Sequence, residues 1–222
     1  MIYVAMFAKH WQPGKVKTRL ADKIGRENAS KVYLAFVEHL TRRLGTSGDI
    51  RSIVYSPPES KSDFEEQFGD DWQLHPQTGG DLGQRMAGFF AEGLKANSKV
   101  ILIGSDTPDI APSRIQQAVE TLDKKDVVLG PCQDGGYYLI GMRKMVPEIF
   151  TGIPWSTGKV LENTVDILNK LQIEFGLLPT MQDVDELPNL KRLRDDLAGM
   201  QTRDELDEQL LKTVAEILDE VE

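Results

Sequence analysis

Cysteine and histidine are scarce in this sequence. Its 222 residues include one cysteine, Cys132, and three histidines, His10, His39 and His75. A single cysteine cannot form an internal disulfide, and the whole set is too small for a zinc cluster. A chain of this length can bury a sufficient hydrophobic core without a disulfide or a structural metal. A lone cysteine is typical of a reducing compartment, so we expect a cytoplasmic protein.

Long apolar segments and excess positive charge are also missing. No run approaches the roughly 20 apolar residues of a membrane-spanning helix. The first residues, MIYVAMFAKHWQPGK, lack the basic start and the small-residue cleavage site of a secretion signal, so we expect neither export nor membrane insertion. The 26 basic and 35 acidic side chains give a net charge of −9, which argues against binding to nucleic acid backbones.

The negative charge is concentrated near the C-terminus. Residues 183–222 carry 13 acidic and 5 basic side chains, a net charge of −8, so residues 1–182 are nearly neutral at −1. Within the neutral part, residues 9–19 hold four basic side chains and no acid. A local cationic segment on an acidic protein points to a small anionic ligand.

Short apolar runs alternate with stretches of helical periodicity, which predicts an α/β fold with helices on both faces of a sheet. The expected strands are 2–8, 50–55, 99–103, 126–129, 137–142 and 173–178. The expected helices are 28–44, 62–68, 82–96, 113–122, 159–171, 187–197 and 204–221. Residues 137–142 follow the preceding strand too closely for a crossover helix, so we expect an antiparallel strand in a mostly parallel mixed sheet.

The last helix is expected to form a segment of its own. Residues 1–199 are predicted to form the main domain, and residues 200–222 an acidic helix docked on it. The apolar stripe that would dock consists of Leu206, Leu210, Val214, Ile217 and Val221. A dimer contact through this stripe is the alternative.

The first motif, FAKHWQPGKVKTRL, follows the first strand. A Pro-Gly pair breaks the chain, and Lys15, Lys17 and Arg19 come at or near the start of a helix, with Lys9 just before them. Free backbone N–H groups and basic side chains at a helix start attract anions, so this segment predicts a phosphate site. A solvated basic loop is the alternative. As loop side chains, Lys17 and Arg19 are expected to add little to stability.

A glycine-rich motif, HPQTGGDLGQRM, precedes the helix expected at residue 82. Gly79, Gly80 and Gly83 permit a backbone to approach a ligand closely, which predicts a substrate-binding loop. Asp81 is a typical N-cap, which explains this residue without a ligand, but capping is compatible with base or sugar recognition, so Asp81 is also a candidate substrate-binding residue.

Aspartates follow two of the expected strands. Asp106 comes directly after the buried run VILIG, at the strand end where α/β sheets bind ligands, and suits Mg²⁺. An Asx turn ahead of the proline is the alternative. Asp183 and Asp185 lie on one side of the chain if their segment is extended, which offers a second carboxylate to a metal. A solvated turn explains them equally well.

A tight turn is expected before the antiparallel strand. Asp134, Gly135 and Gly136 are a common hairpin signal. Because this turn would face the same cleft, we expect Asp134 and Tyr137 to contact an acceptor substrate.

These motifs together resemble a known family. FAKxxxPGxVKTRL, GGDLGQRM, GSDTPDI, GPCQDGGYYLIG, PWST and DVDELPNL are similar to those of bacterial glycosyltransferase-A-like proteins described as nucleotide-diphospho-sugar transferases. Molybdenum cofactor guanylyltransferase and 2-phospholactate guanylyltransferase are more distant relatives by this resemblance. The motifs run from Phe7 to about Leu190 and leave the acidic last helix outside.

The resemblance implies a three-layer α/β/α fold of the glycosyltransferase-A type, with residues 1–199 as the nucleotide-binding transferase domain. It also implies that Asp106, with Asp183 or Asp185, holds Mg²⁺ or Mn²⁺, and that Lys17 and Arg19 hold phosphates. One departure concerns the central strand end. Glycosyltransferases of this fold usually carry Asp-x-Asp there, whereas this sequence has Ser-Asp-Thr-Pro, which is closer to nucleotidyltransferases.

Three functions follow from these observations. The first is transfer of a nucleotidyl group from a nucleoside triphosphate to a phosphorylated small-molecule acceptor, releasing pyrophosphate, with Lys17, Arg19 and Asp106 as catalytic residues. The second is glycosyl transfer from a nucleotide sugar, with Asp134 as acceptor base. The third is a nucleotide-binding module without turnover, which has the least need of a basic clamp and a metal around one phosphate.

Overall fold

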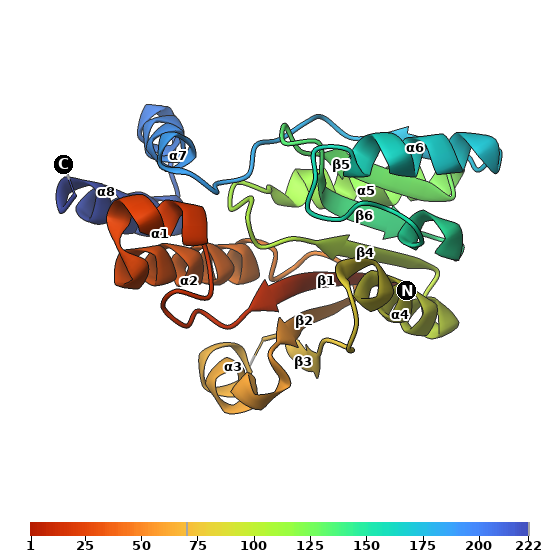
Figure 1. Ribbon diagram of the computed structural model, residues 1–222, viewed down its shortest axis with the longest axis horizontal. Helices are drawn as coiled ribbons and strands as arrows, with labels where there is room; N and C mark the ends of the chain where they lie inside the picture. The colour runs from red at the N-terminus through yellow and green to blue at the C-terminus, as the bar shows by residue number, and fades with distance from the viewer. Residues whose placement is uncertain (70, 222) are drawn as a thin grey trace.

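A seven-stranded sheet forms the centre of the computed structural model, which describes residues 1–69 and 71–221 (Figure 1). The strands are β1 (Ile2–Lys9), β2 (Ile50–Ser56), β3 (Gln73–Pro76), β4 (Lys99–Ile103), β5 (Val127–Pro131), β6 (Tyr137–Met142) and β7 (Phe175–Leu177). Their order in the sheet is β3-β2-β1-β4-β6-β5-β7. Only the pairs made by β6 with β4 and β5 are antiparallel among the described strands. The mostly parallel mixed sheet is confirmed.

Helices cover both faces of the sheet. In the described part of the chain they are α1 (Thr18–Ile24), α2 (Arg26–Arg43), α3 (Lys61–Phe68), α4 (Leu82–Ala96), α5 (Pro112–Lys124), α6 (Val160–Lys170), α7 (Leu187–Gly199) and α8 (Glu205–Asp219). None of them is both long enough and apolar enough to cross a membrane. Two short 3₁₀ turns lie at Pro58–Ser60 and Pro147–Phe150.

The alternation of side chains along β1 explains the layers. Val4 and Met6 point to the core shared with α2, α3 and α5, whereas Ala5 points to the core shared with α4 and α6. All three side chains are completely buried, as expected of a central strand covered on both sides. The three-layer α/β/α architecture is therefore confirmed.

A third core lies between helices, at the end of the molecule where α1, α2, α7 and α8 meet (Figure 1). Helix α2 belongs to two cores, because Tyr33 and Val37 face the sheet while Phe36 faces α8. Val184, just before α7, is buried in the same core. The start of α1 and the segment before α7 are thus anchored to one helical cluster.

Helix α8 packs on α2 through a stripe that differs in part from the expected one. Leu210, Val214 and Ile217 are buried as expected, but Val221 is 38% exposed. The charged Asp207 is buried in place of an apolar residue and accepts a hydrogen bond of 2.5 Å from Arg43 of α2. The expectation for Val221 is wrong because α8 ends at Asp219, before the stripe reaches that position.

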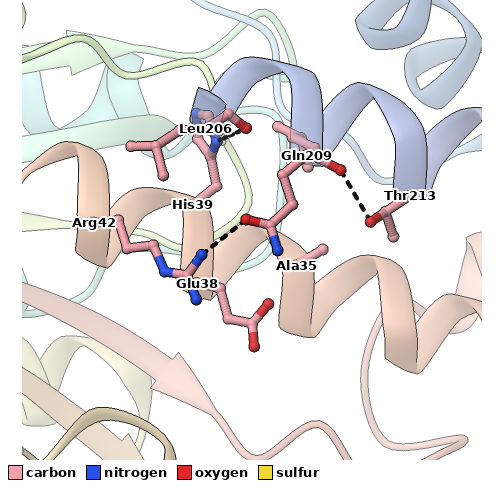
Figure 2. A pocket seen from close by; sticks show the side chains of 8 residues that line it. Ala35, Glu38, His39, Arg42, Leu206, Gln209 and Thr213 are labelled. Atoms are coloured by element: carbon pink, nitrogen blue, oxygen red, sulfur yellow. Dashed lines mark hydrogen bonds between the residues drawn. The ribbon is translucent and has the colours of Figure 1, made fainter. Parts of the chain in front are cut away.

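The contact between α2 and α8 encloses a small cavity of about 30 Å³ (Figure 2). Arg42 donates to the side chain of Gln209 across it at 2.8 Å, and His39 lies against the backbone oxygen of Leu206 at 3.3 Å. A space of this size holds a water molecule at most. This cavity is therefore a feature of helix packing and not a ligand site.

Candidate functional site

The large cleft of the molecule opens at the carboxyl ends of β1 and β4 and has a volume of about 810 Å³. Its walls come from the β1–α1 loop, the loop after β4, the β5–β6 turn, the loop before α6 and the segment before α7. The following residues predicted from the sequence line it: Lys9, Lys15, Lys17, Arg19, Asp106, Asp134, Gly136, Tyr137, Asp183 and Asp185. Those ends of parallel strands are where α/β sheets bind ligands.

The Tyr33 hydroxyl of α2 links the end of β1, where the β1–α1 loop begins, to the loop after β4. The Lys9 N–H donates to the Tyr33 hydroxyl at 2.8 Å, and this hydroxyl lies 2.8 Å from the hydroxyl of Ser105 after β4. The loop then turns at Gly14, which has φ +79°. Burial, followed by the nearby Asp106 carboxylate, raises the pKa of Tyr33 to about 12, so its hydroxyl stays protonated and links the two strand ends.

Lys17 occupies an unexpected position in this loop. Its side chain is 2% exposed, and its ammonium pairs with Asp106 and, at 2.9 Å, with Asp185. Burial alone would lower the pKa of Lys17, but the two carboxylates outweigh that effect and raise it. The expectation that Lys17 is an exposed loop side chain is therefore wrong.

The segment that carries Asp183 and Asp185 extends the edge of the sheet. The Met181 N–H donates to the Pro131 oxygen at 2.9 Å, and the Gln133 N–H donates to the Met181 oxygen at 3.0 Å. One step further, the Val184 N–H donates to the Asp106 oxygen at 2.9 Å. These bonds bring both aspartates beside the loop after β4.

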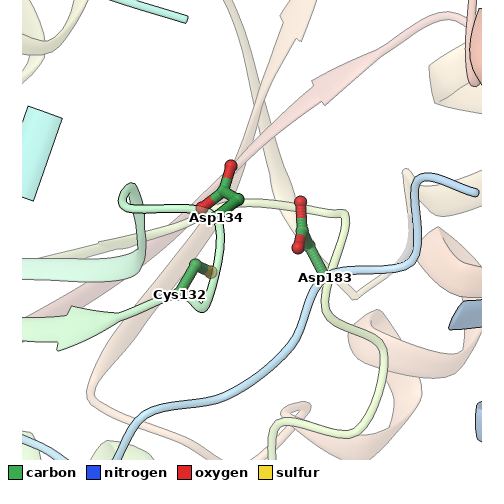
Figure 3. A group of neighbouring side chains, drawn as sticks. All are labelled: Cys132, Asp134 and Asp183. Carbon is green, nitrogen blue, oxygen red and sulfur yellow. The ribbon is translucent and has the colours of Figure 1, made fainter. Parts of the chain in front are cut away.

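Asp134, Asp183 and Cys132 form a compact group at the floor of the cleft (Figure 3). One ligand atom from each residue lies within 4.8 Å of the others. Burial, and then the neighbouring Asp183 and Asp134, raises the pKa of the Cys132 thiol to about 12, so the thiol keeps its proton. The two carboxylates are hard oxygen donors of the kind that Mg²⁺ and Mn²⁺ prefer, and the donor set therefore fits such an ion.

The crowding of carboxylates is visible in their ionisation. Burial, then Asp185 and Asp134, raises the pKa of Asp183 to about 6. In contrast, the pKa of Asp185 is lowered, because its contacts with Lys17 outweigh its burial. The site thus holds more negative charge than the single buried ammonium neutralises.

We expect this crowding to weaken the metal-free protein as the pH rises. The folded state holds the Asp183 proton up to about pH 6, whereas the unfolded chain loses it near 3.8. Because the folded state binds more protons in this window, the free energy of unfolding falls between about pH 4 and pH 6. Urea unfolding in EDTA of wild type and Asp183→Asn measures this contribution as the difference between the two curves. A difference that does not change across the window would contradict the assignment.

Two cations of the cleft are free to meet a ligand. Lys9 and Lys15 are exposed, and no acidic side chain of residues 1–69 or 71–221 lies within ion-pair distance of either. Arg19 is 72% exposed and reaches Glu186 only at 4.0 Å. The cleft therefore has one cationic wall and one acidic wall.

The glycine-rich loop is only partly at the cleft. Asp81 caps α4 by accepting from the Gln84 N–H at 2.8 Å, as the sequence predicts. Gly79, Gly80 and Asp81 are exposed and do not line the cleft. Gly83 is buried, and a Cβ there would lie 2.4 Å from the Trp155 indole nitrogen. A packing requirement thus accounts for Gly83, whereas its neighbours Leu82 and Arg85 do line the cleft.

Gly135 joins two walls of the site, although it does not line the cleft itself. Its φ is +88°, and a Cβ would lie 2.1 Å from the backbone oxygen of Gly158. The Asp134 side chain closes this turn by accepting from the Gly136 N–H at 2.8 Å. The turn therefore needs glycine at position 135 for both backbone conformation and space.

We expect Gly135→Ala to lower the free energy of unfolding by at least about 2 kcal/mol. A left-handed alanine costs about 1–2 kcal/mol, and the clash with Gly158 adds to this. Thermal unfolding would then shift by about 4–8 °C for a chain of this size. Gly79→Ala is the matched control, because no atom lies within 4 Å of its added Cβ. Equal melting temperatures for the two variants would refute the requirement.

Tyr137 enters the cleft wall with its ring against Trp155, at a centroid distance of 6.5 Å and an interplanar angle of 89°. Burial, partly offset by the nearby Thr164 side chain, raises the pKa of the Tyr137 hydroxyl. The ring and not the hydroxyl is therefore the part of Tyr137 that is placed to contact a substrate.

Arg85 is a basic residue of the cleft that the sequence interpretation missed. Its guanidinium donates to the Gly80 oxygen at 2.9 Å and to the Gln77 side chain at 3.3 Å. Arg85 lies one turn inside α4, where an arginine is read as a solvated helix residue. Arg85 lies four residues after the N-cap Asp81, and residues four apart lie on the same face of a helix. This spacing could have predicted that Arg85 lies on the same side of α4 as the glycine-rich loop.

Solved structures share this architecture. A protein of Desulfovibrio desulfuricans G20, described as a putative nucleotide-diphospho-sugar transferase, is 31% identical over 99% of this chain and 97% of that chain, with a TM-score of 0.91. The resemblance to nucleotide-diphospho-sugar transferases is thereby confirmed. No curated protein matches the chain.

More distant structures have the same fold. A cytidylyltransferase from Leptospira borgpetersenii is 12% identical, with a TM-score of 0.57, over 99% of this chain and 96% of that chain. An inositol-1-phosphate CTP transferase from T. maritima is 12% identical, with a TM-score of 0.55, over 96% of each chain. At such identity the likeness concerns the fold alone. Residues 40–157 match a described family, and the chain belongs to it: the "Uncharacterized protein conserved in bacteria (DUF2064)" family.

Proposed function

We propose that this protein binds a nucleoside triphosphate together with a divalent cation and transfers the nucleotidyl group to a phosphorylated small molecule, releasing pyrophosphate. The observation that carries the proposal is the division of the cleft into a cationic wall, with Lys9, Lys15 and Arg19, and an acidic wall. The phosphates of a nucleoside triphosphate would bind the cationic wall, and its divalent cation would bind the acidic wall. A cleft of about 810 Å³ is also within the usual size of small-molecule sites.

The cationic wall acts on the leaving group in this proposal. Negative charge accumulates on pyrophosphate as the nucleotidyl group leaves, and fixed cations stabilise that charge without reorganisation. Arg19 suits this role because its guanidinium is mostly exposed and can bind two phosphate oxygens at once. Lys9 and Lys15 add charge along the same wall.

The acidic wall would hold Mg²⁺ or Mn²⁺. Asp134 and Asp183 supply two carboxylates with ligand atoms within 4.8 Å of each other, and Asp185 and Asp106 continue the group toward Lys17. When bound, such an ion neutralises phosphate charge and orients the phosphate oxygens. Backbone hydrogen bonds at the edge of the sheet join the segments that carry these carboxylates and so fix their positions.

Glycosyl transfer from a nucleotide sugar is the second candidate. The description of the 31% identical Desulfovibrio structure favours it. In that case Asp134, in the turn before β6, is the candidate base for the acceptor hydroxyl. The T. maritima structure, named an inositol-1-phosphate CTP transferase, is similar in fold alone, so the fold is compatible with nucleotidyl transfer as well.

The two candidates release different products. The purified protein with Mn²⁺ or Mg²⁺ is incubated with each nucleoside triphosphate and a set of sugar and polyol phosphates, and pyrophosphate is measured. In parallel it is incubated with nucleotide sugars, and nucleoside diphosphate is measured. Pyrophosphate release that depends on an acceptor supports the proposal, whereas release of diphosphate from nucleotide sugars would replace it with glycosyl transfer.

The cationic wall gives a separate prediction. We expect Arg19→Met to weaken nucleoside triphosphate binding by about tenfold or more, since a charge-assisted bond contributes about 1.5–3 kcal/mol. Its stability should change little because Arg19 is 72% exposed. Titration calorimetry with Mn²⁺ present measures the binding. Arg26→Met, an exposed arginine outside the cleft, is the matched control, and equal affinities for the two variants would remove Arg19 from the site.

A further inference from the structure

Lys17 is a buried cation inside an acidic group that is otherwise open to the cleft. Its side chain is 2% exposed, while those of its partners Asp106 and Asp185 are 52% and 41% exposed. The ammonium thus lies behind the two carboxylates, on the protein side of the site. Both carboxylates still present free surface to the cleft.

The backbone holds Lys17 in this position. It is the residue before α1 and has a left-handed conformation, with φ 46° and ψ 47°, which is uncommon for a residue with a side chain. Its ammonium also lies 5.7 Å from the centre of the Phe36 ring on α2. Such strain is retained where the surroundings enforce it and is concentrated at functional sites.

The carboxylates outnumber this cation. Asp106 and Asp185 contact Lys17, the charge of Asp185 acts on Asp183, and Asp134 lies beside Asp183. The same ammonium joins Asp106 in the loop after β4 to Asp185 in the segment before α7, so it neutralises negative charge where these two segments meet. Lys17 contacts Oδ1 of each carboxylate, so a divalent cation held by both Asp106 and Asp185 would lie close to the ammonium.

We infer that Lys17 is a built-in counter-ion that competes with a divalent cation for Asp106 and Asp185, so that cation binding turns its ammonium out toward the cleft. The inference rests on the cation dependence of the proposed function. The two positive charges repel strongly when both are held at close range on the same pair of carboxylates. Once freed, the ammonium lies beside the cationic wall formed by Lys15 and Arg19.

A different arrangement has a different consequence. A cation held by Asp134 and Asp183 alone, in the group that also contains Cys132, leaves both ion pairs of Lys17 intact. Lys17 then stays as inaccessible with the cation as without it. The accessibility of this one amine therefore distinguishes the two arrangements.

The test is lysine acetylation of the wild-type protein with and without Mn²⁺, followed by mass spectrometry of the peptides, with Mn²⁺ binding measured in parallel by electron paramagnetic resonance. We expect several-fold faster acetylation of Lys17 at saturating Mn²⁺, reversed by EDTA. Lys15, two positions away and already exposed, is the internal control and should react equally in both states.

Two results would overturn the inference. One is that Mn²⁺ binds while Lys17 stays protected, and the other is that Mn²⁺ does not bind at all. Neither result decides the proposed function, because release of pyrophosphate or nucleoside diphosphate is measured separately. Conversely, if Mn²⁺ exposes Lys17 but the protein shows no turnover, the counter-ion inference holds and the proposed reaction is refuted.

Discussion

Replacing Asp183 by asparagine is expected to remove cation-dependent nucleotide turnover while making the metal-free protein more stable above pH 6. Asp183 lies between Asp134 and Asp185, and burial together with these neighbours raises its pKa to about 6. Asparagine keeps the shape but removes the charge that a cation needs. Losing a residue that only supports a metal ligand typically costs about 10–100-fold in activity. Because Asp183 would be a ligand itself, we expect kcat/KM to fall at least about 100-fold.

The gain in stability has the same cause. A change in pKa from 3.8 to about 6 corresponds to about 3 kcal/mol. Because the carboxyl group is partly exposed and water screens it, we expect about 1 kcal/mol in urea unfolding at pH 8 with EDTA. Asp22→Asn, an exposed acid on α1 outside the cleft, is the control. An Asp183→Asn variant that turns over normally with Mn²⁺ would place the cation elsewhere.

The positions of most site residues could be predicted from strand ends. Apolar runs such as VILIG mark buried strands, and the ends of parallel strands meet at one edge, so Asp106 and the β1–α1 loop were expected to lie together. The side of the chain on which Asp183 and Asp185 lie required only the alternation of an extended segment. These inferences depend on local pattern and on a topology that has few alternatives.

Burial could not be predicted where it depends on distant segments. Lys17 looks like part of a solvated basic loop, because its left-handed conformation and its partner Asp185, 168 positions later, are absent from local sequence. Gly83 looks like a ligand-contacting glycine until Trp155 is placed over it. In both cases tertiary contacts decide the role, whereas Lys15, two positions before Lys17, is exposed as the pattern of a basic loop predicts.

Lys17→Met should lower the free energy of unfolding of the metal-free protein by about 2 kcal/mol. Removing one partner of a buried ion pair costs about 3–5 kcal/mol, and the cost is smaller here because Asp106 and Asp185 are about half exposed and regain water. Methionine fills a similar volume beside Phe36, so lost packing contributes little. The melting temperature should therefore fall by about 4–8 °C.

Mn²⁺ should offset most of this loss, because a cation that no longer competes with the ammonium binds the freed carboxylates more tightly. Tenfold tighter binding adds about 1.4 kcal/mol of stabilisation at saturating Mn²⁺. Urea unfolding of wild type, Lys17→Met and the matched control Lys15→Met, each with EDTA and with Mn²⁺, measures both effects. Lys15 is exposed, so its variant should stay within about 0.5 kcal/mol of wild type. If Lys17→Met were as stable as Lys15→Met in EDTA, the ammonium would not be holding the two carboxylates together.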